Sequence, residues 1–155
     1  MTTAYLGLGT NIGNKKENLT RAIEALSLAL GTCKAQSSFL ETEPWGFESD
    51  NGFLNCVVAF DTELTPTELL DTTERIEREL GRTVKSTGGN YHDRLIDIDI
   101  LLYGNTVIES ERLTIPHPLM HLRDFVLMPL AEIAPNTVHP TLNNNIAGLL
   151  AEIRK

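Results

Sequence analysis

The chain has 155 residues, of which 41% are hydrophobic and 22% are charged, so it is long enough to bury a core as one domain over residues 1–155 without disulfides. Its formal net charge of −8 and the lack of a long run of Lys or Arg exclude an extended nucleic-acid-binding surface and attachment to an anionic membrane. Because the two cysteines, Cys33 and Cys56, lack metal-type spacing and no apolar run reaches membrane-spanning length, we expect a cytoplasmic protein.

The first predicted element is a strand over Ala4–Thr10 that runs into a glycine-containing loop. Spacing disfavours two phosphate-binding motifs in this loop. A Walker A motif has Lys directly after its last glycine, whereas Gly13 is followed by Asn14. A dinucleotide-binding fingerprint has its third glycine three residues after the second, whereas Gly9 and Gly13 are four residues apart. We therefore expect only a backbone that another group can approach closely.

A helix is predicted directly after this loop. Asn14 is expected to cap it, Glu17 to complete a start that resembles a capping box, and Gly31 to end it. Its apolar residues recur at helical spacing and predict a face that packs in the core. These residues are Leu19, Ala22, Ile23, Leu26 and Leu30.

Two strands are predicted next, over Thr32–Thr42 and Phe53–Asp61, and we expect them to pair antiparallel. Pro and Gly residues make Glu43–Gly52 a loop. This loop carries the only Trp of the chain, Trp45, and leads to Asn55 in the next strand. Two interpretations stay open. The aromatic side chains cover an edge of the core, or together with Asn55 they form a flat slot that binds a heterocycle.

A second helix is predicted from a strong start signal, with Thr65 as N-cap, Pro66 at the first helical position and Glu68 at the third. It should end at Gly81, and its inner apolar stripe consists of Leu69, Thr73, Ile76 and Leu80. The polar segment Arg82–Arg94 follows, and its length and central glycine pair predict a mobile loop. It is either a solvated loop or a source of cations for phosphoryl groups. Its cationic residues are Arg82, Lys85, His92 and Arg94.

The strand Leu95–Leu102 carries the pattern that the rest of the chain is arranged around. Side chains alternate between the two faces of a strand, so Asp97 and Asp99 share one face while isoleucines fill the other. Aspartate is depleted in strands, so two in one apolar run need an explanation. They form either the polar face of a half-exposed strand or a site for a hard cation such as Mg²⁺, which prefers oxygen ligands.

A short strand is predicted near Val107–Ile108, and Arg112–Pro118 should be extended because proline disfavours helix at the residue before it. His117 and His121 are four residues apart, but Pro118 lies between them, which disfavours a helical zinc-binding pair.

Two helices are predicted in the C-terminal part, over Leu119–Ile133 with a bend or split at Pro129, and over Leu142–Arg154 with an interruption at Gly148. The predicted order of the main elements is β-α-β-β-α-β. This order predicts an α+β fold of the ferredoxin-like sandwich type, with a mainly antiparallel four-stranded sheet and added C-terminal helices.

Six motifs of this chain, in this order and spacing, resemble one protein family. They are Tyr5–Gly13, Thr42–Gly46, Phe53–Asn55, Arg94–Ile100, Arg112–Pro118 and Arg123–Leu130. The most specific is Arg-x-x-Asp-Ile-Asp-Ile at Arg94–Ile100. Together they resemble 6-hydroxymethyl-7,8-dihydropterin pyrophosphokinase of folate biosynthesis over essentially the whole chain.

This resemblance implies an enzyme of the ferredoxin-like fold, an ATP-dependent pyrophosphokinase (diphosphotransferase). It would transfer pyrophosphate from ATP to the hydroxymethyl group of 6-hydroxymethyl-7,8-dihydropterin and release AMP. Asp97 and Asp99 would hold two Mg²⁺ ions, and Arg82 and Arg94 would be further catalytic residues. The implied pterin-binding residues are Thr42, Glu43, Trp45, Phe53, Asn55 and Phe125. The implied ATP-binding residues are Glu77, Arg82, Arg94, Ile100, Arg112, Thr114, His117 and Arg123.

The sequence departs from the family pattern in one loop. Where the family usually has Trp-Gly-Pro-Arg, this chain has Tyr91-His92-Asp93-Arg94, and a second loop arginine is replaced near Val84. The departure concerns how this loop closes over ATP. Our hypothesis is that Asp93 pairs with Arg94 when ATP is absent.

Two alternatives to the pyrophosphokinase stay open. A ligand-sensing ferredoxin-like domain would bind a heterocycle or nucleotide without turnover, and it would not need two aspartates on one face. A pterin aldolase is a further candidate, but that family lacks the double-aspartate strand. For the pyrophosphokinase, we expect ATP and 6-hydroxymethyl-7,8-dihydropterin as small-molecule partners, no nucleic-acid or membrane partner, and a monomer.

Overall fold

The computed structural model describes residues 1–42, 52–81 and 95–155. The strands of its main sheet are β1 (Thr2–Thr10), β2 (Cys33–Gln36), β3 (Leu40–Thr42), β4 (Phe53–Thr62) and β5 (Asp97–Tyr103). Its α-helices are α1 (Lys15–Leu30), α2 (Pro66–Gly81), α3 (Asp124–Ile133) and α4 (Ile146–Ile153). A small hairpin consists of β6 (Ile108–Glu109) and β7 (Thr114–Ile115).

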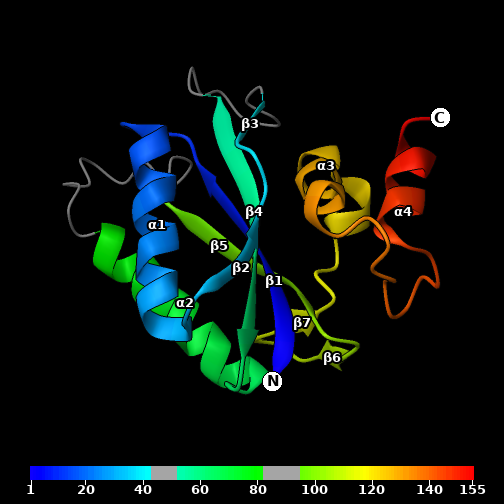
Figure 1. The fold of residues 1–155 in the computed structure, drawn as a ribbon, viewed down its shortest axis with the longest axis horizontal. Helices are drawn as coiled ribbons and strands as arrows, with labels where there is room; N and C mark the ends of the chain where they lie inside the picture. The colour runs from blue at the N-terminus through cyan, green and yellow to red at the C-terminus, as the bar shows by residue number, and fades with distance from the viewer. Residues whose placement is uncertain (43–51, 82–94) are drawn as a thin grey trace.

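The main sheet is antiparallel, with the strand order β2-β4-β1-β5 and with β3 paired to β4. Helices α1 and α2 lie on one side of it, and α3 and α4 on the other (Figure 1). The predicted α+β class and the antiparallel sheet are therefore confirmed.

The first hydrophobic core fills the space between the sheet and helices α1 and α2. Alternate residues of β1, and of β5 as far as Ile100, point into it, as the alternation along a strand requires. Its fully or nearly fully buried members include Leu6, Leu8, Leu19, Leu26, Phe60, Leu69, Ile76, Ile98 and Ile100. Burying one Leu or Ile side chain stabilises the fold by roughly 2 kcal/mol, so this core holds both helices against the sheet.

A second, smaller core lies between the opposite face of the sheet and helices α3 and α4. It consists of buried side chains from β4, β5, α3, α4 and the segment before α3. They are Val57, Leu101, Leu102, Met120, Leu127, Leu130, Ala134, Ile146 and Leu149. Because this core reaches only part of its sheet face, the remainder of that face is left for other groups.

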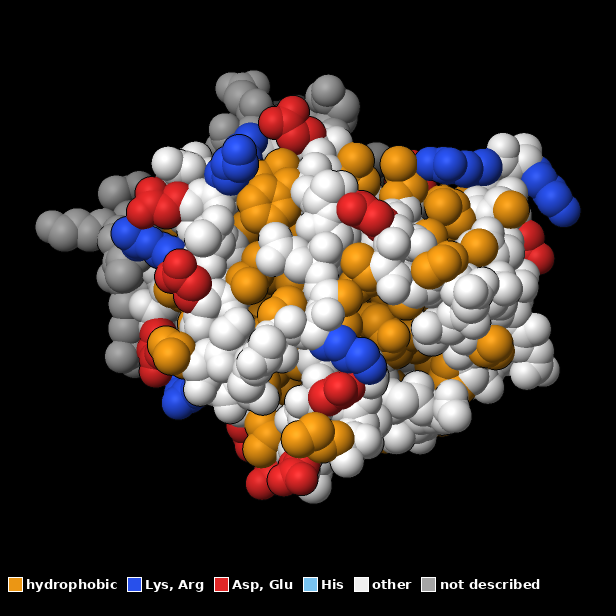
Figure 2. Space-filling model, in the orientation of Figure 1, with side chains coloured by type: hydrophobic (Ala, Val, Ile, Leu, Met, Phe, Trp, Pro, Cys, Tyr) orange, Lys and Arg blue, Asp and Glu red, His pale blue; other side chains and the backbone are white. Residues whose placement is uncertain are grey.

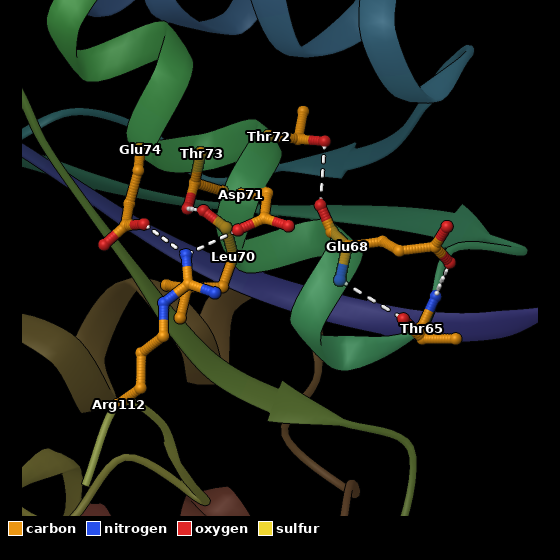
Figure 3. A network of polar contacts seen from close by, with 8 residues as sticks. All are labelled: Thr65, Glu68, Leu70, Asp71, Thr72, Thr73, Glu74 and Arg112. Atoms are coloured by element: carbon orange, nitrogen blue, oxygen red, sulfur yellow. Dashed lines mark hydrogen bonds and ion pairs between the residues drawn. The ribbon is translucent and has the colours of Figure 1, made fainter.

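The predicted starts of α1 and α2 are confirmed by their caps. The Asn14 side chain accepts a hydrogen bond from the Glu17 N–H at 3.1 Å. At the start of α2, the Glu68 N–H donates to Thr65 Oγ1 at 3.2 Å and the Thr65 N–H donates to Glu68 Oε1 at 2.9 Å, a reciprocal capping box (Figure 3). Helix α1 ends before Gly31, whose φ of +105° suits glycine.

The single strand predicted over Thr32–Thr42 is wrong, because it is divided into β2 and β3. Between them, the Ser37 N–H donates to the Val57 carbonyl, and Ser37 Oγ accepts from the Val57 N–H, each at 2.9 Å. A side-chain oxygen thus replaces a backbone carbonyl in the ladder. The Ser38 N–H and Oγ–H then bind the Glu132 carboxylate of α3 at 2.9 and 2.8 Å, which ends the regular pairing.

The C-terminal helices differ from their predicted bounds. A 3₁₀ turn over Met120–Leu122 ends at Arg123, whose extended backbone (φ −117°, ψ 108°) separates it from α3. The split therefore comes at Arg123, and Pro129 lies inside α3. Helix α4 begins later than predicted, and Gly148 does not interrupt it, because the Gly148 N–H donates to the capping Asn145 side chain at 2.8 Å.

Figure 2 shows one face of the molecule. On it, hydrophobic side chains gather over the region of α3, while Lys and Arg side chains of the described residues lie apart from one another. None of the helices within the described ranges combines the length and the apolar composition needed to cross a bilayer.

Candidate active site

A cavity of about 730 Å³ opens on the sheet face that α3 and α4 cover only in part. Strands β1, β4 and β5 form its floor, and the segment 119–126 at the start of α3 forms a wall. Long-range pairing in the sheet therefore brings together side chains from distant parts of the chain.

Two glycines of β1 form the middle of the cavity floor. Gly9 pairs with Asp97 of β5 on one side and with Asn55 of β4 on the other, and Gly7 pairs with Asp99. Paired residues of adjacent strands point to the same face, so these polar side chains flank a strip of bare backbone. Two strand spacings separate Asn55 from Asp97, which is about 9–10 Å between their backbones.

The predicted strand over Ala4–Thr10 is confirmed, since β1 continues through Gly7 and Gly9 to Thr10. The signal was present in Leu6-Gly7-Leu8-Gly9, which alternates apolar residues with glycine at the period of a strand. Leu6 and Leu8 pack in the first core, and at Gly7 and Gly9 the opposite face of the strand carries no side chains. Because these side chains are missing, the backbone of β1 leaves the space of the cavity open.

Asp97 and Asp99 both line the cavity, while Ile98 and Ile100 on the opposite face are each only 5% exposed. The predicted shared face of the two aspartates is therefore confirmed. Glu77 of α2 holds the strand between them, because its Oε2 accepts the backbone N–H of Ile98 at 2.8 Å. This contact fixes the outer edge of β5 at the point where both carboxylates project.

Four predicted pterin-binding residues lie around the same cavity: Thr42, Phe53, Asn55 and Phe125. Asn55 is 8% exposed, and its amide Nδ2–H donates to Thr42 Oγ1 at 3.1 Å. This bond fixes the orientation of the amide, with its NH₂ group toward Thr42. The other two predicted members, Glu43 and Trp45, lie outside the described residues.

The wall of the cavity carries a cation next to an aromatic ring. Arg123 and Phe125 both line the cavity, and the Arg123 guanidinium carbon lies 5.7 Å from the centre of the Phe125 ring. This is within the range of a cation–π contact. The extended backbone at Arg123, which sequence patterns did not predict, separates the 3₁₀ turn from α3 at this wall.

His117 lies close enough to β5 for the charge of Asp99 to affect the pKa of its ring. Its backbone N–H donates to the Leu101 carbonyl at 3.0 Å, and its Nδ1 accepts the Leu119 N–H at 3.2 Å. Burial lowers the pKa of His117, the Asp99 carboxylate opposes this shift, and Arg123 adds to it. Since Nδ1 accepts a hydrogen bond, the neutral ring carries its proton on Nε2.

Of the predicted ATP-binding residues that the structure describes, only Arg123 lines this cavity, whereas Glu77, Ile100, Arg112, Thr114 and His117 do not. The Ile100 side chain packs in the first core, Thr114 lies in the β6–β7 hairpin, and Arg112 pairs with carboxylates of α2. A contact of Ile100 with a nucleotide would therefore use its backbone. Arg82 and Arg94 lie outside the described residues, as does the loop predicted to carry them.

The only cysteine that lines the cavity, among the described residues, is not a nucleophile. Burial, with a smaller contribution from Cys33, raises the pKa of the Cys56 thiol to about 12. The thiol is therefore protonated at neutral pH, whereas nucleophilic attack needs the thiolate. This favours chemistry that depends on positioning and charge rather than on a cysteinyl intermediate.

The donor set of the cavity fits a hard cation that shares its ligands with a substrate. Among the described residues, no three Asp, Glu, His or Cys side chains are arranged to hold a metal ion by themselves. Two carboxylates on one strand face are what Mg²⁺ uses when water and phosphate oxygens complete its coordination. Asp97 and Asp99 meet this requirement.

A second pocket of about 170 Å³ lies beside the β6–β7 hairpin and contains His139. His139 is 3% exposed, and its Nδ1 accepts the N–H groups of Thr141 and Leu142 at 3.3 and 3.2 Å. Its Nε2 is buried and has no hydrogen-bond partner among the described residues. The His121 ring lies at 6.4 Å between centres.

The buried His139 leads to a prediction about stability and pH. Burial, and to a lesser extent His121, lowers the pKa of His139 in the folded protein below the ordinary 6.5. The unfolded chain therefore binds this proton more readily, so the free energy of unfolding should be largest above pH 6.5 and fall as the pH drops below it. Urea unfolding at pH 7.5 and 5.5 measures the difference. His139→Asn keeps an acceptor near the Nδ1 position and should reduce this fall. An equal fall in the variant would contradict the assignment.

Comparison with known proteins places these features in one family. Residues 5–135 match the family model described as 7,8-dihydro-6-hydroxymethylpterin-pyrophosphokinase (HPPK). A 2-amino-4-hydroxy-6-hydroxymethyldihydropteridine pyrophosphokinase of Porphyromonas gingivalis is 52% identical over 141 residues, which are 90% of this chain and 95% of that protein. An Aquifex aeolicus protein of the same name is 44% identical over 140 residues, 90% of this chain and 85% of that one.

The fold has solved relatives as well. The crystal structure of wild-type Plasmodium falciparum HPPK-DHPS superimposes with a TM-score of 0.75 at 18% identity. The match covers 97% of this chain, which spans 44% of that solved chain. At this identity the likeness supports the fold alone.

Proposed function

Since this chain belongs to the 7,8-dihydro-6-hydroxymethylpterin-pyrophosphokinase family, we propose that it transfers pyrophosphate from ATP to the hydroxymethyl group of 6-hydroxymethyl-7,8-dihydropterin, with Mg²⁺, and releases AMP. It is an enzyme, an ATP-dependent diphosphotransferase of folate biosynthesis. One observation supports the detailed reaction most strongly. A single cavity joins two carboxylates on β5 to an amide and aromatic rings on β4 and α3.

The metal end of the proposed site is the β5 side of the cavity. Asp97 and Asp99 would hold two Mg²⁺ ions together with the phosphates of ATP. Bound there, Mg²⁺ neutralises phosphate charge and favours an in-line displacement. The contribution of the chain is position: the Glu77–Ile98 contact holds the strand, and the bare glycines leave room for the phosphates.

The pterin end of the proposed site is the β4 side. We assign the ring to a slot between Phe53 and Phe125, with Asn55 and Thr42 hydrogen-bonding its edge. The Asn55–Thr42 bond orients the amide before a ligand arrives, which lowers the entropic cost of binding. Glu43 and Trp45 complete this proposal as residues carried over from the family pattern. The separation of Asn55 from Asp97 by two strand spacings leaves the reacting hydroxyl between the two ends.

The remaining assigned residues concern ATP. We propose that the nucleotide contacts the following residues: Glu77, Arg82, Arg94, Ile100, Arg112, Thr114, His117 and Arg123. Arg123 supports this because its positive charge lies at the cavity wall, within the electrostatic range of His117. Arg82 and Arg94 are proposed as catalytic cations that stabilise the charge of the transferred group.

Further proposals concern the molecule as a whole. The strand order β2-β4-β1-β5, with helices after β1 and β4, supports the ferredoxin-like type for residues 1–155 as one domain. We also propose a monomer, and the formal net charge of −8 argues against nucleic-acid or membrane partners. Both cysteines are free, in keeping with the reducing cytoplasm.

One assay tests the proposed reaction against a binding domain without turnover. The purified chain is incubated with ATP, Mg²⁺ and 6-hydroxymethyl-7,8-dihydropterin, and nucleotides are separated by chromatography. We expect AMP in equal amounts to pyrophosphorylated pterin, and no AMP when the pterin or Mg²⁺ is omitted. ADP as the product would indicate a different phosphoryl transfer, and absence of turnover would favour the sensing domain.

The glycine floor leads to a prediction about pterin affinity. A Cβ at Gly9 would lie 2.9 Å from Asn55 Oδ1, closer than real Cβ contacts allow, and Asn55 is held by Thr42. Gly9→Ala should therefore displace the amide and weaken pterin binding about tenfold, the equivalent of one hydrogen bond. A Cβ at Gly7 would lie 3.4 Å from the Leu101 side chain, so Gly7→Ala should have a smaller effect. Pterin titration by fluorescence compares them, and equal affinities would refute the role of Gly9.

A further inference from the structure

Arg112 is held by two carboxylates of α2, which we call the Arg112 clamp (Figure 3). Its Nη2 lies 2.5 Å from Asp71 Oδ1 and 2.6 Å from Glu74 Oε1. Asp71 and Glu74 are three residues apart, so they are neighbours on one face of the helix. Arg112 comes from the connection between β6 and β7, so the clamp ties that hairpin to α2.

The clamp limits how Arg112 can bind anything else. A guanidinium grips a phosphate with two parallel N–H groups, taken either from Nη1 and Nη2 or from Nε and Nη2. Both grips use Nη2, and each of its two hydrogens is directed to a carboxylate. Within the described residues these are the only hydrogen bonds of the Arg112 head group. Nε–H and the two Nη1–H groups stay available, each for a single hydrogen bond.

The net charge of the clamp also argues against a phosphate as its ligand. Two carboxylates and one guanidinium leave it with one net negative charge, and the hydrogen bonds to Asp71 and then Glu74 raise the pKa of Arg112. A net negative group is a poor partner for a triphosphate. It is a suitable partner for hydroxyl groups and ring nitrogens, which accept single hydrogen bonds without carrying charge.

The position of the clamp on α2 suits the uncharged part of a nucleotide. Glu77 lies on the same helix face as Asp71 and Glu74, one turn further on, and it contacts β5 between the two cavity aspartates. From Asp71 to Glu77 the helix rises about 9 Å. This is comparable to the length of a triphosphate chain, so phosphates near Asp97 and Asp99 would place the nucleoside near the clamp.

We propose that Asp71 and Glu74 are positioning residues that hold Arg112 so that it donates single hydrogen bonds to the nucleoside part of ATP and does not grip the triphosphate. This inference rests on the proposed function and on the assignment of Arg112 to ATP. It adds two residues that neither the motifs nor the cavity identified.

Neutral variants of the clamp test the positioning role. Asp71→Asn, Glu74→Gln and their combination keep the shape and remove the charge. We expect the double variant to raise the KM for ATP about five- to tenfold, with kcat and the affinity for pterin unchanged. Arg112→Ala should raise the KM for ATP by at least as much, and adding it to the double variant should change little further, because the three residues act as one unit. Glu79→Gln, an exposed charge change on the same helix, is the matched control.

Competitive inhibitors then separate the two ends of ATP. Arg112→Ala should weaken inhibition by AMP by the same factor as the KM for ATP rises, and it should leave inhibition by inorganic tripolyphosphate unchanged. Weaker inhibition by tripolyphosphate would overturn the proposal, because Arg112 would then hold phosphates. A lower KM for ATP in the clamp variants would also overturn it, since the carboxylates would then compete with the nucleotide. A change in thermal unfolding alone, with KM unchanged, would reduce the clamp to a structural tie.

A direct binding measurement separates the test of the clamp from the test of the proposed reaction. Calorimetric titration of each variant with AMP and with tripolyphosphate, without pterin, reports the same difference in affinity with no turnover. If the unmodified chain forms no AMP from ATP, the proposed function fails on that assay. If it does form AMP and the clamp variants bind AMP as tightly as the unmodified chain, the proposal about the clamp fails by itself.

Discussion

Replacing Asp97 or Asp99 with asparagine is expected to lower turnover by about 10³-fold, equivalent to about 4 kcal/mol of transition-state stabilisation. Each substitution keeps the shape of the side chain but removes one of two negative charges that face the bare backbone of Gly9 and Gly7. Both carboxylates belong to one cation-binding face, so losing either one removes the charge that offsets the cations beside the phosphates. Steady-state AMP formation at a fixed Mg²⁺ concentration measures the loss.

Two controls make this result specific. The affinity for pterin, measured by fluorescence titration, should change by less than about twofold, because the pterin end of the cavity is two strands away. Asp61→Asn changes another aspartate of the same sheet, one that accepts a hydrogen bond from Thr3 at 2.5 Å at the far end of β4, and turnover should persist. Near-full turnover of Asp97→Asn or Asp99→Asn at ordinary Mg²⁺ would refute the metal assignment.

Phe125→Ala is expected to weaken pterin binding about 30-fold, equivalent to about 2 kcal/mol. The reason is the loss of a ring that lines the cavity wall and could stack on a flat heterocycle opposite Phe53. The turnover at saturating pterin should change much less, since Phe125 lies on α3 whereas the proposed metal ligands lie on β5. Equilibrium titration with 6-hydroxymethyl-7,8-dihydropterin measures the affinity directly.

The contact of Phe125 with Arg123 requires a matched variant. Phe125→Tyr keeps the ring and its cation–π contact, so pterin affinity should stay close to that of the unmodified chain. Phe125→Ala also leaves Arg123 without its ring partner, and a decrease in the affinity for ATP would report that effect separately. Unchanged pterin affinity in Phe125→Ala would remove this residue from the proposed pocket.

Local sequence signals predicted the elements with their own start and stop chemistry. The Asn14 cap and the Thr65–Glu68 box lie where expected, because each needs only residues three positions apart. The predictions were wrong where a residue distant in the sequence determines the local structure. Ser37 breaks a predicted strand through bonds to Val57, and Ser38 is held by Glu132, 94 residues away. No local pattern contains those partners.

In the candidate site, too, some features follow from local sequence patterns and others from contacts between distant segments. The shared face of Asp97 and Asp99 follows from the two-residue period of a strand, and the family motifs then suggested a use for it. All four proposed pterin contacts in the described residues were also named from motifs, and the structure gathers them around one cavity. The glycine floor and the Arg112 clamp were not named. Each depends on which segments become neighbours after folding.

The sequence alone therefore determined the capped helices, the alternation of the aspartate strand and the motifs that assign the family. Tertiary structure decided that Gly7 and Gly9 lie between Asp97 and Asn55, which sit 42 residues apart in the chain. It also decided that Glu77 holds Ile98 and that Asp71 and Glu74 hold Arg112. The physical reason is the distance along the sequence over which each interaction acts. Caps and strand faces depend on neighbours within one turn or two residues, whereas register and side-chain partners across the sheet depend on which surfaces are buried together.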